Sequence, residues 1–279
     1  MRIRIVDAFT DRPFSGNPAG VLLLDAFPAD HWLQKVAAEV NLSETAFAHP
    51  LPPGAAPGGD GVPDGGEDWA LRWFTPTTEV DMCGHATLAT AHVLHTTGRA
   101  TGTVRFHARC GVLTATARQD GTVTLDFPTS PLTPIEVPDG VADALGATPV
   151  SVHDTADHIG DLLVELADER TVRGLAPDLA ALKHRSKRGI IVTAAAEDPS
   201  RGYDFVSRGF FPNVGIDEDP VTGSAHTALA PFWSARTGRT ELTGLQGGAR
   251  TGIVRTSLRG DRTLLNGHAV TVIEGDLRA

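Results

Sequence analysis

The chain is poor in the features that mark several common classes of protein. Its 279 residues include 2 cysteines, which excludes a disulfide framework and a cysteine-rich zinc site and is typical of a reducing compartment. Lys and Arg number 24 against 34 Asp and Glu, so the formal net charge is −10 and nucleic acid is a poor partner. No apolar run reaches the length of a membrane span, and the N-terminus does not follow the signal-peptide pattern. We therefore expect a cytoplasmic protein that binds a small molecule and contacts no membrane.

Motifs for nucleotides and metals are also missing. No strand is followed by Gly-x-Gly-x-x-Gly, and there is no phosphate-binding loop with its lysine, so a nucleotide or nicotinamide is not expected. His92 and His95 are three residues apart on a predicted helix, but no carboxylate or cysteine lies at ligand spacing from them. The sequence predicts neither a cofactor nor a metal.

Residues 74–94 read as a strand end, a polar turn and a helix. From Ala86 to Leu94 nearly every residue is small or apolar, so we expect this helix to be covered on most sides. The first N–H groups of a helix have no partner within it and carry partial positive charge. Gly84, His85 and Ala86 therefore offer a site for a carboxylate or phosphate.

The same arrangement recurs in residues 210–233. Both copies have Phe-x-Pro, an acidic turn and a glycine, Gly84 or Gly223, that begins an alanine-rich helix; Ser224 follows the second glycine. This similarity indicates an internal duplication, although chance resemblance between two strand-turn-helix units is the alternative. Two similar lobes, with both helix starts facing one cleft, would form a single anion site.

The segment 128–138 holds four prolines and is the predicted linker. We therefore divide the chain into an N-terminal lobe, residues 1–127, and a C-terminal lobe, residues 128–279, whose last strand is free to pack on the first lobe. Asp120-Gly121 and Asn266-Gly267 are hairpin signals, which predict a largely antiparallel sheet and an α+β fold.

Two further segments of the N-terminal lobe carry predictions. Asp30 is placed to cap a helix that ends near Val40. Residues 51–67 are rich in glycine and proline and predict a mobile surface loop.

Four polar residues near the helix starts are candidates for chemistry. Glu44, between a helix and a short strand, suits a general base whose pKa is raised in a partly dry cleft, but surface acids at helix ends are commoner. His85 would move a proton or bind substrate, or be a turn histidine. Cys83 beside a helix N-terminus would be a reactive thiolate or simple packing. Asp219 is either a turn or capping acid or a second catalytic group.

Three segments, Asn41–Thr45, Phe74–Thr87 and Asp219–His226, resemble the signature segments of the PhzF-like (phenazine biosynthesis) proteins. This resemblance covers essentially the whole chain. It implies a fold like that of diaminopimelate epimerase: two similar lobes, each a mostly antiparallel sheet round a central helix, with the site between them, and usually a homodimer. It also implies that Glu44 is the acid/base, and that the residues matching His85, Asp219 and Ser224 line the site.

The PhzF enzyme of phenazine synthesis isomerises a dihydro-hydroxyanthranilate without a cofactor, so the leading hypothesis is an isomerase of a small carboxylate. Cys83–Thr87 departs from the Ala-Gly-His-Pro motif of enzymes dedicated to phenazine. In related epimerases two cysteines flank the substrate; Cys83 matches the first, whereas Thr222 stands at the second. An epimerase or dehydratase that uses Cys83 is therefore an alternative, and a non-catalytic binding protein is another. The predicted substrate-binding residues are Gly84, Ala86, Gly223, Ser224, Cys83 and Thr222.

Overall fold

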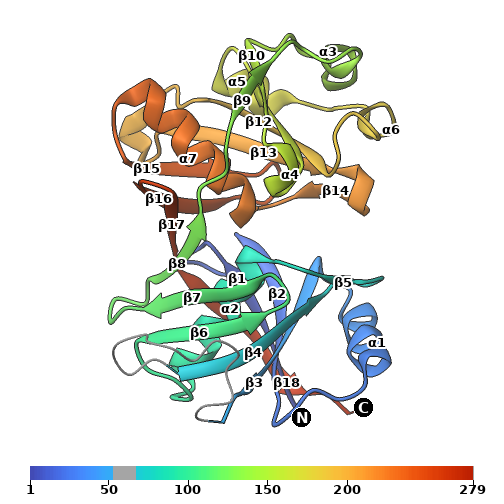
Figure 1. Ribbon diagram of the computed structural model, residues 1–279, viewed down its shortest axis with the longest axis vertical. Coiled ribbons are helices and arrows are strands. Elements are labelled where there is room, and N and C mark those ends of the chain that lie inside the picture. The colour runs from blue at the N-terminus through green and yellow to red at the C-terminus, as the bar shows by residue number, and fades with distance from the viewer. Residues whose placement is uncertain (53–66, 279) are drawn as a thin grey trace. The chain divides into compact units, whose positions relative to one another are not determined.

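Each half of the chain contains a curved sheet and one long buried helix in the computed structural model, which describes residues 1–52 and 67–278 (Figure 1). Most of the predicted surface loop, residues 53–66, lies outside the described residues. No helix among the described residues combines the length and the apolar character needed to cross a membrane.

The chain divides into two compact units. Unit 1 comprises Met1–Asp126 and Asn266–Ala279, and unit 2 comprises Phe127–Leu265. The sequence placed the boundary after residue 127. After unit 2 the chain returns to unit 1, where the C-terminal strand pairs with the N-terminal one, so the two ends of the colour range lie side by side in Figure 1.

Unit 1 is built from a continuous series of paired strands. The strands β18, β1 and β2 are antiparallel, β2 and β3 are parallel, β3 and β4 are antiparallel, β4 and β6 are parallel, and β6, β7 and β8 are antiparallel. A short strand, β5, adds to β4. The bounds are β1 Arg2–Ala8, β2 Asn17–Leu23, β3 Glu44–Pro50, β4 Glu67–Phe74, β5 Glu79–Val80, β6 Thr103–Ala108, β7 Gly111–Ala117, β8 Val123–Pro128 and β18 Ala269–Asp276, with helices α1 Asp30–Val40 and α2 Gly84–Thr96.

Unit 2 repeats this order of pairings. The strands β9, β10 and β11 are antiparallel, β11 and β12 are parallel, β12 and β13 are antiparallel, β13 and β15 are parallel, and β15 and β16 are antiparallel, with β14 added to β13. The strands are β9 Thr133–Ile135, β10 Ser151–Asp154, β11 Asp161–Glu165, β12 Gly189–Ala195, β13 Phe205–Phe211, β14 Ile216–Asp219, β15 Glu241–Gln246, β16 Gly252–Arg259 and β17 Arg262–Gly267. The helices are α3 Val141–Leu145, α4 Ala156–Ile159, α5 Glu169–Gly174, α6 Leu179–Leu182 and α7 Gly223–Thr237, with 3₁₀ turns η1 Pro199–Arg201 and η2 Pro212–Val214.

The two units therefore share one topology. From β2 to β7 in unit 1, parallel and antiparallel strand pairs follow one another in the same order as from β11 to β16 in unit 2. Each unit also has a short strand before its central helix. The central helix stands between β5 and β6 in unit 1, and between β14 and β15 in unit 2. The predicted α+β fold of two similar lobes is confirmed.

Helix α2 forms the centre of unit 1 because it has no polar face. Ten of its residues are buried, and it packs against β1, β2, β3, β7 and β18. The hydroxyls of Thr87 and Thr90 donate to the carbonyl oxygens of Cys83 and Ala86, at 2.6 and 2.7 Å, so these threonines enter the core without an unpaired hydroxyl proton. The predicted covered helix is confirmed.

The predicted cap of α1 is wrong. Ala29 occupies the cap position without a side-chain hydrogen bond, and Asp30 is the first helical residue. The carboxylate of Asp30 instead accepts a hydrogen bond from Arg72 Nη1 at 2.8 Å. The helix ends at Val40, and the left-handed conformation of the next residue, Asn41 (φ 53°), turns the chain towards β3 and so positions Glu44 at the start of that strand.

Candidate functional site

Unit 1 brings Glu44 and His85 together. Glu44 is the first residue of β3 and His85 the second of α2, and their Oε2 and Nε2 atoms lie 3.4 Å apart. The side chains are 12% and 4% exposed, so the pair is largely shielded from water while the carboxylate keeps some access. The burial of α2 fixes the histidine, and the end of α1 fixes the strand that carries the carboxylate.

The imidazole of His85 is held as a neutral ring with its proton on Nε2. The Nδ2 amide of buried Asn17 lies 3.2 Å from His85 Nδ1, and the Asn17 carbonyl oxygen accepts from Ser43 Oγ at 3.5 Å. In this arrangement Nδ1 accepts, so the ring proton is on Nε2, which lies 3.4 Å from Glu44 Oε2 and 3.5 Å from Ser43 Oγ. Burial lowers the pKa of His85 to about 3, and the ring is therefore uncharged at neutral pH.

Cys83 completes a cluster with these two residues. Its Sγ lies 3.4 Å from His85 Nδ1, whereas Glu44 Oε2 lies 3.4 Å from the other ring nitrogen, Nε2. Glu44, Cys83 and His85 each offer a ligand atom within 4.8 Å of the others, so they are the residues that could hold a metal ion in the described part of unit 1. One imidazole gives a metal only one nitrogen, however, whereas the thiol and the carboxylate contact different nitrogens. Binding a metal would require one of these contacts to be rearranged.

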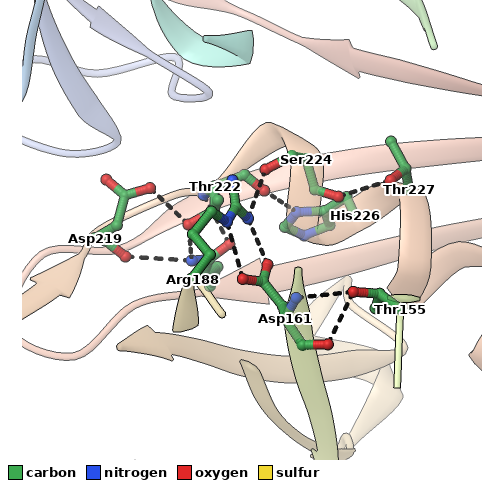
Figure 2. A network of polar contacts seen from close by, with 9 residues as sticks. Thr155, Asp161, Arg188, Asp219, Thr222, Ser224, His226 and Thr227 are labelled. Atoms are coloured by element: carbon green, nitrogen blue, oxygen red, sulfur yellow. Dashed lines mark hydrogen bonds and ion pairs between the residues drawn. The ribbon is translucent and has the colours of Figure 1, made fainter. Parts of the chain in front are cut away.

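In unit 2, Asp219, Thr222 and Gln246 form one hydrogen-bonded group at the start of α7. Thr222 Oγ1 donates to Asp219 Oδ2 at 2.5 Å (Figure 2). Gln246 Nε2 donates to Thr222 Oγ1 at 3.0 Å and to the Asp219 carbonyl oxygen at 3.2 Å. The Thr222 N–H in turn donates to Gln246 Oε1 at 2.9 Å. All three residues are buried, so the turn before the helix is rigid.

Arg188 and Asp161 form a second group, which the sequence did not predict. Asp161 has no exposed side-chain surface, and its carboxylate accepts from Arg188 Nε at 2.8 Å and from Nη2 (Figure 2). The same Nη2 donates to Ser224 Oγ at 3.0 Å. Burial raises the pKa of Asp161, and the guanidinium acts in the opposite direction. No sequence pattern joins residues 27 positions apart; the parallel pairing of β11 with β12 does so.

The predicted site residues thus fall into two sets. In unit 1, Glu44, Cys83 and His85 cluster, and Gly84 and Ala86 belong to the buried first turn of α2. In unit 2, Asp219 contacts Thr222, while Gly223 and Ser224 form the buried first turn of α7. The catalytic and binding roles of these residues stay predictions.

The buried histidines predict a loss of stability in weak acid. Burial lowers the pKa of His226 to about 4, and its Nδ1 lies 2.9 Å from the Thr222 carbonyl oxygen. In the unfolded chain a histidine has a pKa near 6.5, so below that pH the unfolded state binds more protons than the folded state. The stabilisation is complete above pH 6.5 and decreases as the pH falls towards about 4. At pH 5 the expected loss is about 2 kcal/mol for each fully buried imidazole.

Urea unfolding at pH 7 and pH 5, with NMR titration of the imidazole protons, measures this effect. The His226→Asn variant keeps a donor near the Thr222 carbonyl oxygen but does not titrate, so its stability should depend less on pH. Titration of His226 near pH 6.5 in the folded protein would contradict the prediction.

The family model described as "Phenazine biosynthesis-like protein" (PhzC-PhzF) matches residues 6–275. The chain belongs to this family. A Pseudomonas aeruginosa protein named as an uncharacterized isomerase is 48% identical over 273 residues, which are 98% of this chain and 96% of that protein. The crystal structure of a PhzF-family protein from Enterococcus faecalis is 37% identical, with a TM-score of 0.87, and the match covers 100% of this chain and 99% of that one.

A hydroxyproline epimerase from Agrobacterium vitis, solved with trans-4-hydroxy-L-proline bound, is 14% identical with a TM-score of 0.59, over 99% of this chain and 91% of that one. At this identity the likeness concerns the fold alone. Together the comparisons show that the phenazine biosynthesis-like chain has the epimerase-like fold, and they support an isomerase-type role.

Proposed function

We propose that this phenazine biosynthesis-like protein is a cofactor-independent isomerase that moves a proton between carbon atoms of a small, carboxylate-bearing substrate. The single observation that carries the proposal is the pairing of Glu44 with neutral His85 at the start of a buried helix. A carboxylate with restricted access to water is suited to accept a proton from carbon and to return it. The isomerase names of relatives agree with this class of reaction.

In the proposed reaction the Glu44 carboxylate takes a proton as one C–H bond breaks. The electron pair shifts through an adjacent double bond, and the protonated Glu44 then delivers the proton to a second carbon. The substrate and product are isomers, and Glu44 ends as the carboxylate. His85 Nε2 lies 3.4 Å from Glu44 Oε2 in the resting protein, and this contact is proposed to orient the carboxylate before the reaction.

In each unit the first-turn N–H groups of the buried central helix, α2 or α7, are proposed as a binding site for a substrate carboxylate. These turns contain Gly84 and Ala86 in one unit, and Gly223 and Ser224 in the other. Glycine at the first position of each helix lets a ligand approach the backbone closely. A dihydroaromatic carboxylate is the proposed substrate class, with phenazine synthesis as a candidate pathway and a homodimer as the proposed assembly.

Reaction of the protein with a dihydro-hydroxyanthranilate in D₂O, followed by proton NMR, tests the proposal. We expect the substrate to convert to an isomer in which one carbon has lost a hydrogen and another has gained hydrogen or deuterium. Loss of a hydroxyl group as water, or failure to convert this compound and related cyclic carboxylates, would contradict a proton-transfer isomerase.

An epimerase or dehydratase is the second candidate, because Cys83 Sγ lies 3.4 Å from His85 Nδ1. A thiol beside an imidazole nitrogen can become a thiolate that removes a proton from an α-carbon. Exchange of the α-hydrogen of 4-hydroxyproline for deuterium, lost in a Cys83→Ser variant, would favour this candidate. Related epimerases have a second cysteine where this chain has Thr222, which argues against an epimerase that uses two thiols.

A further inference from the structure

The guanidinium of Arg188 has a fixed orientation. Its Nε and Nη2 donate to the carboxylate of Asp161, and its plane lies over the ring of Phe211, with Cζ 5.0 Å from the ring centroid. Asp161 is itself held through its backbone, because its N–H donates to Thr155 Oγ1 and its carbonyl oxygen accepts from the Thr155 hydroxyl, both at 2.8 Å. A buried carboxylate thus fixes a cation that remains 29% exposed.

This orientation determines what the hydroxyl of Ser224 can do. Arg188 Nη2 donates to Ser224 Oγ at 3.0 Å, so the oxygen serves as an acceptor towards the guanidinium and its own proton must point elsewhere. Ser224 is 6% exposed, and no residue in the described part of the chain accepts that proton. A nearly buried donor without an acceptor indicates a ligand that supplies one.

The partial positive charge at the start of α7 favours an anionic acceptor at Ser224. Ser224 is in the first turn of α7, whose N–H groups carry partial positive charge, and the Arg188 guanidinium lies beside it. The nearest acid of the predicted site, Asp219, already accepts a hydrogen bond from Thr222 at 2.5 Å. A carboxylate oxygen at Ser224 would therefore receive one hydroxyl hydrogen bond at the positive end of a helix, beside a guanidinium whose charge Asp161 balances.

We infer that Arg188 is a positioning and specificity-determining residue, which aims the Ser224 hydroxyl at a substrate carboxylate and makes unit 2 select that carboxylate over the matching amide. The inference depends on the proposed function only for the statement that the ligand is the substrate. The selection itself is a property of the Asp161–Arg188–Ser224 group (Figure 2).

Binding of 3-hydroxyanthranilate and of its amide, measured by calorimetry, tests the inference without turnover. Because Arg188→Gln alone leaves a buried carboxylate unpaired, the main variant is the double replacement Asp161→Asn with Arg188→Gln, which removes both charges together. We expect its Kd for the acid to rise on the order of tenfold or more, and its Kd for the amide to change little. Ser224→Ala should show the same pattern, and combining all three replacements should add little to either effect.

Two further variants separate positioning from general support of the fold. Arg188→Lys keeps the charge and should recover part of the preference for the acid. Arg236→Gln removes another arginine of unit 2, which pairs with Glu165 at 2.7 Å near the other end of α7, and should leave both Kd values unchanged. Equal losses for acid and amide, equal effects of the Arg188 and Arg236 replacements, or no binding of the acid to the wild-type protein at millimolar concentrations would overturn the inference.

The result is independent of the catalytic test. If Glu44→Gln abolishes isomerisation while the acid binds without Arg188, the inference fails and the proposed function stands. If the charge-selective binding is found but no carboxylate is isomerised, the carboxylate site stands and the proposed function fails.

Discussion

Glu44→Gln is expected to lower kcat of the proposed isomerisation by about 10²–10⁴-fold, which is the range for the loss of a general acid or base. Glutamine keeps the volume of the side chain and an oxygen that can face His85 Nε2, 3.4 Å from the Glu44 carboxylate, but it cannot take a proton from carbon. Substrate binding and folding should change little. Initial rates, KM and a urea unfolding curve, measured on the same preparation, separate these effects.

Two further variants test whether the loss of activity is specific to Glu44. Glu39→Gln removes an exposed carboxylate on α1, five residues before Glu44, and should leave kcat unchanged. Cys83→Ala should be mild if Glu44 carries the proton, because the thiol contacts the opposite ring nitrogen of His85. A Cys83→Ala variant as inactive as Glu44→Gln would transfer the catalytic role to the thiol and favour an epimerase or dehydratase.

Arg208→Met is expected to destabilise unit 2 by about 1–3 kcal/mol, the range for leaving buried acceptors without their hydrogen-bond donor. The Glu218 side chain, at 28% exposed, is partly solvated and adds less than a fully buried acid would. Arg208 is 8% exposed; its Nε and Nη2 donate to the carboxylate of Glu218, both at 2.8 Å, and its Nη1 donates to the Leu175 carbonyl oxygen at 2.7 Å. Methionine matches the aliphatic stem but satisfies none of these acceptors. The loss would therefore combine an unpaired acid with an uncapped end of α5.

Equilibrium urea unfolding, followed by tryptophan fluorescence, measures the loss. Arg259→Met is the matched control, because Arg259 pairs with Glu241 at 2.6 Å while both side chains are about 60% exposed. Pairs of that kind contribute about 0–1 kcal/mol. Similar losses for the two variants would show that the buried hydrogen bonds of Arg208 contribute little to stability.

Patterns within short segments predicted a large part of the fold. The small and apolar residues from Ala86 to Leu94 predicted a covered helix, and α2 is buried along its length. The repeated Phe-x-Pro, acidic turn and glycine predicted two similar lobes, and the pairings of β2–β7 and β11–β16 repeat in the same order. These predictions succeed because neighbouring residues in the sequence carry both signals: the apolar composition of a buried helix, and the glycines and prolines at which helices and strands end.

Other elements of unit 2 escaped prediction. The strand β13, Phe205–Phe211, is buried at every position and lacks the alternation of a half-buried strand. The strand β15, Glu241–Gln246, contains a glycine whose Cβ would meet the ring of Phe205 at 2.5 Å, so its composition follows from close packing and not from strand propensity.

By itself the sequence determined the family, the two-lobed α+β fold and the identity of Glu44, His85, Asp219 and Ser224 as candidates, because each belongs to a local motif. Only the tertiary structure showed that Asn17 sets the tautomer of His85, and that Asp161 orients Arg188 towards Ser224. These contacts join residues 68, 27 and 36 positions apart. The direction of a hydrogen bond depends on where folding places both partners, and the pairing of strands distant in sequence fixes those places.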